Sequence, residues 1–300
     1  MSRLSVLIIT VLFFSIQCIG QNETSKVNKL VAPGAKIEKL SGGFLFTEGP
    51  IADANGNIYF TDQPNDKIHI WSTDGKLTTF LEPAGRANGL YFDKKGNLWA
   101  CAEAKNELWS ISPDKQVTKI PLNFEGNIFN GPNDLWITKG NGVYFTDPFW
   151  RRTFWDHSEQ PQKKESLYYL HPDHSTLTRI DGDLVKPNGL VGSADGKSLY
   201  VSDQGARRTY KYNIQKDGSL TNKTLFCEMG SDGMTIDSKG NIYLTGRGVL
   251  IFDKTGQQVG TIDIPEGPTN VCFGGKDLKT LFVTARTGIY SIKMNVKGAR

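Results

Sequence analysis

Short runs of apolar and aromatic residues recur along the chain, and turns that contain glycine separate them. One such run is Ile58–Phe60, and the segment KIHIW at residues 67–71 alternates apolar with polar positions. Alternation over about four to eight residues, with many β-branched and aromatic side chains, is typical of half-buried β-strands. No apolar repeat with the helical period extends over a useful length. The pattern therefore predicts an all-β protein.

These runs belong to six copies of one larger repeat. Each copy starts with an acid or an amide, continues with a first apolar strand, and reaches its second strand ten or eleven residues after that start. A third and a fourth run follow in most copies. Four antiparallel strands in about 40 residues form one blade of a β-propeller, so six copies predict a six-bladed β-propeller. The starting residues are Glu48, Asn88, Asn133, Asn188, Asp232 and Asn270.

The two ends of this repeat array complement each other. The last copy ends near Val296 without a fourth strand, whereas residues 35–43 (AKIEKLSGG) form an isolated strand before the first copy. Pairing these two segments would close the ring and remove its open edge. We therefore expect residues 35–300 to form one propeller domain that is closed by an N-terminal strand. The constant register of the repeats disfavours a division into two all-β domains.

The composition agrees with a folded domain and narrows the class of function. Hydrophobic residues make up 38% of the chain and charged residues 22%, which excludes wholesale disorder. The 32 glycines exceed the usual share, as expected for many hairpin turns. The formal net charge is +4, and no basic block accompanies it. Nothing in the charge pattern therefore indicates binding to nucleic acid.

The first 20 residues have the layout of a secretory signal peptide. A single charge, Arg3, precedes an apolar run, and small residues stand before a plausible cleavage site at Gln21. The run is too short for a membrane-spanning helix, and lipid attachment at Cys18 is a less favoured alternative. We expect an exported protein, periplasmic or secreted, with no membrane segment after cleavage. Residues 21–34 are expected to form a flexible lead-in, and Cys101, Cys227 and Cys272 are expected to be buried rather than disulfide-bonded.

The six starting residues carry the chemical signal. All of them bear oxygen, and equivalent positions in a propeller converge at one end of the central channel. An alternative is that they only form turns, as Asp74-Gly75 and Asp195-Gly196 do, because Asn-Gly and Asp-Gly are common turn pairs. Two carboxylates and several amides form a hard oxygen site. Such a site suits Ca²⁺, Mg²⁺ or Mn²⁺ better than zinc or copper.

Several motifs, taken in order along the blades, resemble the senescence-marker-protein/gluconolactonase family, which includes regucalcin. They are FTEGP (46–50), GPNDL (131–135), YFTDP (144–148), KPNGL (186–190) and SDGMTID (231–237), and they look most like the bacterial gluconolactonase branch. The animal branch has an Arg where Gly131 stands here, which puts animal-type sugar recognition in doubt. The resemblance implies a six-bladed propeller with a divalent ion bound by Glu48, Asn133, Asn188 and Asp232. In that family the residue matching Asp232 is also the proposed proton acceptor, and the residue matching Asn133 is a ligand or a substrate contact.

These observations lead to the hypothesis of a metal-dependent lactonase. The expected ion is Ca²⁺, with Mg²⁺, Mn²⁺ or Zn²⁺ as alternatives, and the expected partner is a small sugar lactone; the oligomeric state stays open. Antiparallel geometry places the ends of the second strands at the same end of the ring, near Asp62, Glu103, Asp147 and Asp203. The predicted catalytic residues are Asp232 and Asp203, and the predicted substrate contacts are Asn88, Asn133, Asp147 and Asn270.

Two alternatives and one loop remain open at this point. The same metal site could serve an aryl-esterase or a phosphotriesterase, or the propeller could be a non-catalytic scaffold around a structural Ca²⁺. Residues 149–165 (FWRRTFWDHSEQPQKKE) interrupt the third blade directly after Asp147. Their aromatic and arginine side chains suit either a lid over the site or a packed surface loop.

Overall fold

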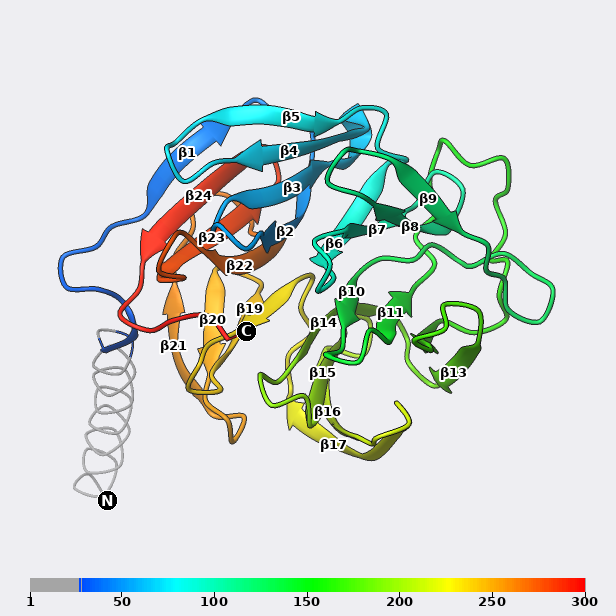
Figure 1. The fold of residues 1–300 in the computed structure, drawn as a ribbon. Helices are drawn as coiled ribbons and strands as arrows, with labels where there is room; N and C mark the ends of the chain where they lie inside the picture. The colour runs from blue at the N-terminus through cyan, green and yellow to red at the C-terminus, as the bar shows by residue number, and fades with distance from the viewer. Residues whose placement is uncertain (1–26, 28, 300) are drawn as a thin grey trace, which may run out of the picture.

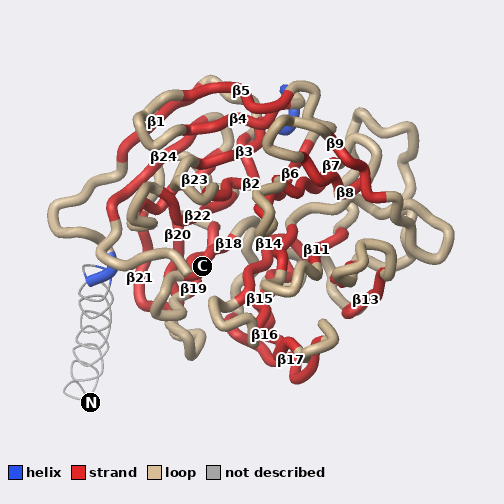
Figure 2. Tube along the Cα trace, viewed as in Figure 1, coloured by secondary structure: helices blue, strands red, loops and turns tan. Residues whose placement is uncertain are grey.

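The structure is a computed structural model that describes residue 27 and residues 29–299. Its strands form six four-stranded antiparallel sheets that follow one another around a central axis (Figure 1). Figure 2 shows how completely strands and loops dominate the described residues. A short 3₁₀ helix, η1 (Gln63–Asn65), follows the second strand of the first blade. The predicted six-bladed propeller is confirmed.

The first three blades are continuous in sequence, and their strands run from the channel outward in chain order. Blade 1 contains β2 (Thr47–Ala52), β3 (Ile58–Asp62), β4 (Lys67–Trp71) and β5 (Leu77–Leu81). Blade 2 contains β6 (Ala87–Phe92), β7 (Leu98–Ala102), β8 (Glu107–Ile111) and β9 (Val117–Ile120). Blade 3 contains β10 (Leu135–Ile137), β11 (Val143–Asp147), β12 (Ser166–Leu170) and β13 (Leu177–Asp181).

The last three blades have the same order, and the sixth takes its outer strand from the start of the chain. Blade 4 contains β14 (Pro187–Gly192), β15 (Ser198–Asp203), β16 (Arg208–Ile214) and β17 (Leu220–Cys227). Blade 5 contains β18 (Met234–Ile236), β19 (Ile242–Thr245), β20 (Val249–Phe252) and β21 (Gln258–Ile262). Blade 6 contains β22 (Asn270–Gly274), β23 (Thr280–Ala285), β24 (Gly288–Lys293) and β1 (Glu38–Gly42).

The ring closes as the sequence predicts. Strand β1 pairs antiparallel with β24, with Glu38 opposite Ser291 and Gly42 opposite Gly288. The blue and red ends of the chain therefore lie side by side in one sheet (Figure 1). This pairing covers the open edge of blade 6 with the chain's own backbone and joins the two ends of the array.

The segment before β1 also contacts blade 6. Leu30 is buried in the apolar cluster of that blade, Val31 bridges to Met294, and the amide of Ala32 donates to the carbonyl of Lys293 at 3.0 Å. The part of the expected lead-in that the structure describes is therefore attached to the propeller. The predicted signal peptide, residues 1–20, lies outside the described residues. No helix among the described residues is long and apolar enough to cross a membrane.

Most of the core lies between neighbouring blades rather than along the axis. The cluster between blades 2 and 3, for example, packs Trp99 and Leu108 against Phe145 and Tyr168, all fully buried. Both faces of each sheet are covered in this way, which explains the long runs of buried positions in the second strands. Cys101, Cys227 and Cys272 are free and buried, as expected. The blades thus hold one another in place without a continuous core along the axis.

Candidate metal and active site

The inner strands change their register where the predicted channel residues stand. In blade 1 the pairing with β3 moves from Glu48 to Ile51 over a bulge, and in blade 2 it moves from Ala87 to Leu90. Blade 4 has the same irregularity, from Pro187 to Leu190. A bulge leaves its residues out of the ladder and re-aims their side chains. The sequence signal for these bulges is the channel residue followed by glycine or by Gly-Pro.

Backbone hydrogen bonds join neighbouring blades at this level. The amide of Gly89 donates to the carbonyl of Asn133 at 2.8 Å, and the amide of Gly189 donates to the carbonyl of Asp232 at 2.7 Å. The amide of Gly233 donates to the carbonyl of Thr269 at 2.9 Å. The inner strands therefore approach each other closely around the channel, and the side chains of the ring are held by a rigid backbone.

Buried hydroxyl groups support the same ring from behind. Thr61 donates to the carbonyl of Asn88 at 3.2 Å, and Ser202 donates to the carbonyl of Ser231 at 2.8 Å. Both residues stand one position before the end of the second strand of one blade and bond to the inner segment of the next, and both are buried. Because each bond joins neighbouring blades, the Thr-Asp and Ser-Asp pairs of the sequence hold adjacent channel residues in position.

Carboxylates and amides of the predicted ring hydrogen-bond to each other. Asn188 donates from Nδ2 to Oδ1 of Asp232 at 2.8 Å, and Asn270 donates from Nδ2 to Oε2 of Glu48 at 2.9 Å. Glu48 also accepts the amide of Gly49 at 2.7 Å on the same oxygen. The structure therefore brings together residues from blades 1, 4, 5 and 6 that are far apart in the chain.

Each predicted metal ligand keeps one oxygen without a hydrogen-bond donor among the described residues. Glu48 accepts hydrogen bonds on Oε2 and none on Oε1, and Asp232 accepts a hydrogen bond on Oδ1 and none on Oδ2. Asn188 donates from Nδ2 to Asp232 and Gln204, and its Oδ1 has no donor. The side chain of Asn133 is buried and makes no hydrogen bond among the described residues. Asn270 differs, because its Oδ1 accepts the amide of Val271 at 2.7 Å.

Sequence reasoning missed a third carboxylate, Asp134. Its side chain is buried and accepts the amide of Leu135 at 2.9 Å. Its charge raises the pKa of Glu48, and the charge of Asp232 in turn raises the pKa of Asp134. With it, carboxylates come from blades 1, 3 and 5, and amides come from blades 2, 3, 4 and 6. The only signal in the sequence is its place directly after Asn133.

The loop at residues 149–165 attaches to blade 2 beside this ring. Arg152 donates from Nε and Nη2 to the carboxylate of Glu103 at 2.6 and 2.9 Å, and Trp155 donates from Nε1 to the carbonyl of Glu103 at 2.6 Å. Glu103 also accepts Nδ2 of Asn88 at 2.8 Å. A Cβ on Gly131 would come within 3.0 Å of the Trp155 ring, so the missing side chain there makes room for this loop.

We predict that Arg152→Gln raises KM for a lactone substrate about tenfold and lowers kcat much less. The reason is that Glu103 holds Nε and Nη2 of Arg152, whereas Nη1 makes no hydrogen bond among the described residues and is free to donate to a substrate. A hydrogen bond to a charged group is worth about 1.5–3 kcal/mol. The matched control is Arg151→Gln, since Arg151 is exposed beside it. Initial rates over a range of lactone concentrations decide the matter, and equal KM values for both variants would count against a substrate contact.

The aspartates that end the second strands have structural contacts. Asp147 accepts the amides of Asn130 and Gly131 at 3.0 and 2.8 Å, and Asp203 accepts those of Val185 and Lys186 at 3.0 and 2.9 Å. Asp62 binds two amides of the preceding loop in the same way. Both oxygens of each group are occupied. These contacts favour loop support over the catalytic role predicted for Asp203 and the substrate contact predicted for Asp147, and the proposal below uses neither.

Burial dominates the electrostatics of the ring. It raises the pKa of Asp134 to about 7 and that of Asp232 to about 6, although the hydrogen bond from Asn188 and the charge of Arg152 oppose the shift at Asp232. Burial, together with the charge of Asp232, raises the pKa of Glu48 well above its ordinary value. Three buried acids in one channel repel each other when ionised. The ring therefore favours either protons or a cation.

This electrostatics predicts an unusual dependence of stability on pH. Carboxyl groups titrate near about pH 4 in the unfolded chain, so a raised pKa means that the folded state binds the proton more tightly. In EDTA, the contribution of Asp232 is present at low pH and is lost as the pH rises through about 6. Asp232→Asn should therefore stabilise the metal-free protein more at pH 8 than at pH 5.

Thermal melts of wild type and Asp232→Asn in EDTA measure this difference directly. The comparison cancels His69, whose pKa burial lowers and which acts in the opposite direction in both proteins. Added Ca²⁺ should raise the melting temperature of wild type more at pH 8 than at pH 5, because protons compete with the ion. A variant that is destabilised equally at both pH values would contradict the assignment.

Comparison with known proteins identifies the family. A family model described as the SMP-30/gluconolactonase/LRE-like region matches residues 46–287. The chain belongs to this family. It is 29% identical to a gluconolactonase of Zymomonas mobilis, over 91% of this chain and 85% of that protein. It is 27% identical to regucalcin of Oryctolagus cuniculus, over 81% of this chain and 84% of that protein.

Solved structures of the family have the same architecture. A gluconolactonase from Xanthomonas campestris superimposes with a TM-score of 0.83 at 26% identity, covering 89% of this chain and 92% of that one. The family model, the relatives named gluconolactonase and the shared fold agree with each other. The protein is a lactonase, a hydrolase of the gluconolactonase family.

Proposed function

We propose that the protein opens a sugar lactone by hydrolysing its ester bond, and that one divalent cation, with Ca²⁺ as the first choice, is required. One observation carries the proposal: Glu48, Asn133, Asn188 and Asp232 each keep an oxygen without a donor among the described residues, at one end of the channel. Carboxylate and amide oxygens that accept no hydrogen bond from the protein are available to bind a cation. A cation between them would also relieve the repulsion between Glu48 and Asp232.

The donor set fits a hard cation. Carboxylate and amide oxygens are the ligands that Ca²⁺ prefers, and Glu48 and Asp232 neutralise the two charges of the ion. Among the described residues no group of three or more His, Cys, Asp or Glu side chains is placed to hold a metal. Such a group is not needed here, because two of the four proposed ligands are amides. The same composition disfavours zinc, which prefers nitrogen and sulfur.

Different residues of the chain have different roles in the proposed hydrolysis. A divalent cation on these oxygens would polarise the lactone carbonyl and acidify a bound water. Asp232 also accepts the proton of the attacking water, and the hydrogen bond from Asn188 to its Oδ1 orients the carboxylate. Glu103 holds both Asn88 and Arg152, and these two side chains would orient the hydroxyl groups of the sugar. The backbone hydrogen bonds of Gly89, Gly189 and Gly233 between neighbouring blades keep these groups in fixed relative positions.

The test is lactone hydrolysis by metal-stripped protein with single metals restored. D-Glucono-δ-lactone is assayed with Ca²⁺, Mg²⁺, Mn²⁺ and Zn²⁺, and paraoxon and phenyl acetate are assayed beside it. We expect activity on the lactone that disappears with EDTA and returns best with Ca²⁺. Equal activity in EDTA would refute metal dependence. Faster turnover of the aryl ester or the phosphotriester would favour that alternative, and a folded protein inactive on every substrate would favour the scaffold.

We also propose that the protein is exported, on the basis of residues 1–20. Expression of the full chain followed by N-terminal sequencing of the mature protein tests this, with Gln21 as the expected first residue. Retention of Met1 in the mature protein would contradict export by cleavage.

A further inference from the structure

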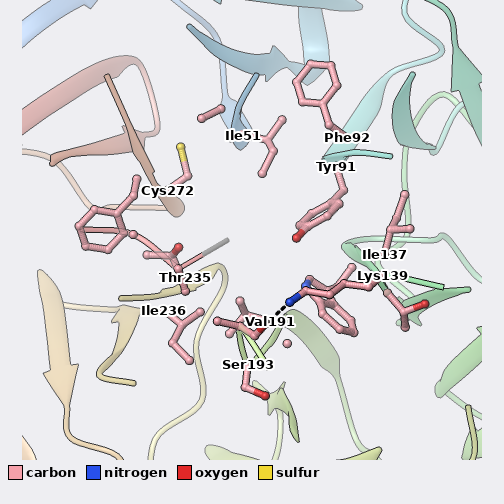
Figure 3. A pocket seen from close by; sticks show the side chains of 18 of the residues that line it. Ile51, Tyr91, Phe92, Ile137, Lys139, Val191, Ser193, Thr235, Ile236 and Cys272 are labelled. Carbon is pink, nitrogen blue, oxygen red and sulfur yellow. Dashed lines mark hydrogen bonds between the residues drawn. The ribbon is translucent and has the colours of Figure 1, made fainter. Parts of the chain in front are cut away.

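A cavity lies at the opposite end of the channel from the ring of Glu48. It has a volume of about 540 Å³ and is formed where the far ends of the inner strands and the turns after them diverge (Figure 3). None of the six predicted channel residues lines it. The lactonase proposal therefore gives this cavity no role.

The walls of this cavity are largely apolar. Aliphatic and aromatic side chains from all six inner strands or their ends contribute, among them Ile51, Tyr91, Trp136, Ile236 and Phe273. Figure 3 shows the hydroxyl groups of Tyr91 and Thr235 directed toward the middle. A concave, mostly apolar space of this volume with a few polar groups has the properties of a small-molecule site.

The charges at this cavity are unbalanced. Two lysines, Lys94 and Lys139, line it from blades 2 and 3, and both are exposed. The one acid among the lining residues is Asp93, and its carboxylate is occupied by Asn97 and by the amide of Lys95 in its own turn. Lys139 donates from Nζ to the carbonyl of Ala194 at 2.7 Å, which holds the ammonium group over the rim (Figure 3). No carboxylate among the described residues neutralises either lysine there.

We propose that this cavity binds a small amphiphilic carboxylate, a medium-chain aliphatic or an aromatic acid. The apolar body would lie among the side chains of the inner strands, where burial of apolar surface drives binding. The carboxylate would lie at the rim, where Lys139 and Lys94 supply hydrogen-bond donors of opposite charge. The assignment combines the shape, the apolar lining and the charge of the rim. It does not depend on lactone hydrolysis.

Octanoate and 1-octanol are suitable probes, because they share an apolar body and differ in the head group. Isothermal titration calorimetry of the full mature protein should show one octanoate per chain and weaker binding of octanol. Lys94→Gln combined with Lys139→Gln should weaken octanoate about tenfold and leave octanol unchanged. The matched control is Lys216→Gln with Lys254→Gln, two exposed lysines at the same end of the molecule that do not line the cavity.

Filling the cavity provides the second arm of the test. Thr235→Trp should remove the binding of both probes, and Ile51→Trp serves if the first variant does not fold, as judged by its melting temperature. Absence of saturable octanoate binding to wild type would overturn the proposal. Binding that survives cavity filling would do the same, and equal losses of octanoate and octanol in the lysine variant would overturn the assignment of the carboxylate.

Discussion

Replacing Asp232 with Asn is expected to lower kcat for D-glucono-δ-lactone about 10³-fold, within the range that general bases and metal ligands supply. The substitution keeps the shape of the side chain and removes the charge, so the proton acceptor and one of two carboxylate ligands disappear together. The hydrogen bond from Asn188 to Oδ1 can persist, which keeps the loop in place. Steady-state rates with saturating Ca²⁺ measure the loss.

The matched control for this substitution is Glu228→Gln. Glu228 is an exposed acid in the same loop before blade 5, and it should change kcat less than twofold. Glu48→Gln should lose activity comparably but should recover part of it at high Ca²⁺, because Glu48 is a proposed ligand and not the base. An Asp232→Asn variant that keeps more than about a tenth of the wild-type kcat would move the base to another residue.

Gly49→Ala is expected to have the largest effect on folding, a loss of about 3 kcal/mol or more in the free energy of unfolding. Gly49 has a φ of +52°, a left-handed conformation that L side chains rarely adopt. A Cβ there would overlap the backbone carbonyl oxygen of Asn88, so the inner strands of blades 1 and 2 would have to separate. Since the amide of Gly49 also holds Glu48, activity should fall with stability.

Gly75→Ala separates the two causes of this effect. Gly75 has a φ of +80° in an open hairpin turn, with nothing within 4 Å of the position a Cβ would take. Its cost should be only the conformational one, about 1 kcal/mol. Urea denaturation of both variants gives the comparison. Equal losses would show that the close contact between blades contributes nothing beyond backbone conformation.

The fold could be predicted because the propeller repeats a local pattern six times. The predicted starts of the second strands coincide with the structure at Ile58, Leu98, Val143 and Ile242, and two others differ by one residue. The N-terminal closing strand could be inferred from a missing fourth strand in the last copy. A register set by alternating burial and by short turns is local, so the sequence specifies it directly.

Only those site residues that stand at a repeated position of each blade could be predicted from the sequence. The repeat places Glu48 and Asp232 in the channel, but Asp134 follows a channel residue, and alternation along a strand places such a residue on the opposite face. That rule fails in blade 3, because Asn133 and Asp134 both precede the strand. The pairing of Arg152 with Glu103 joins an irregular loop to another blade, and no local pattern encodes it.

The most direct measurement of the central claim is the position of the metal. Anomalous diffraction from crystals of the metal-stripped protein soaked with Mn²⁺ would locate the ion in the channel. The proposal predicts a single strong peak that contacts Glu48, Asn133, Asn188 and Asp232, and its absence in crystals of Glu48→Gln. A peak bound by other residues, or an empty channel in wild type at saturating Mn²⁺, would contradict it.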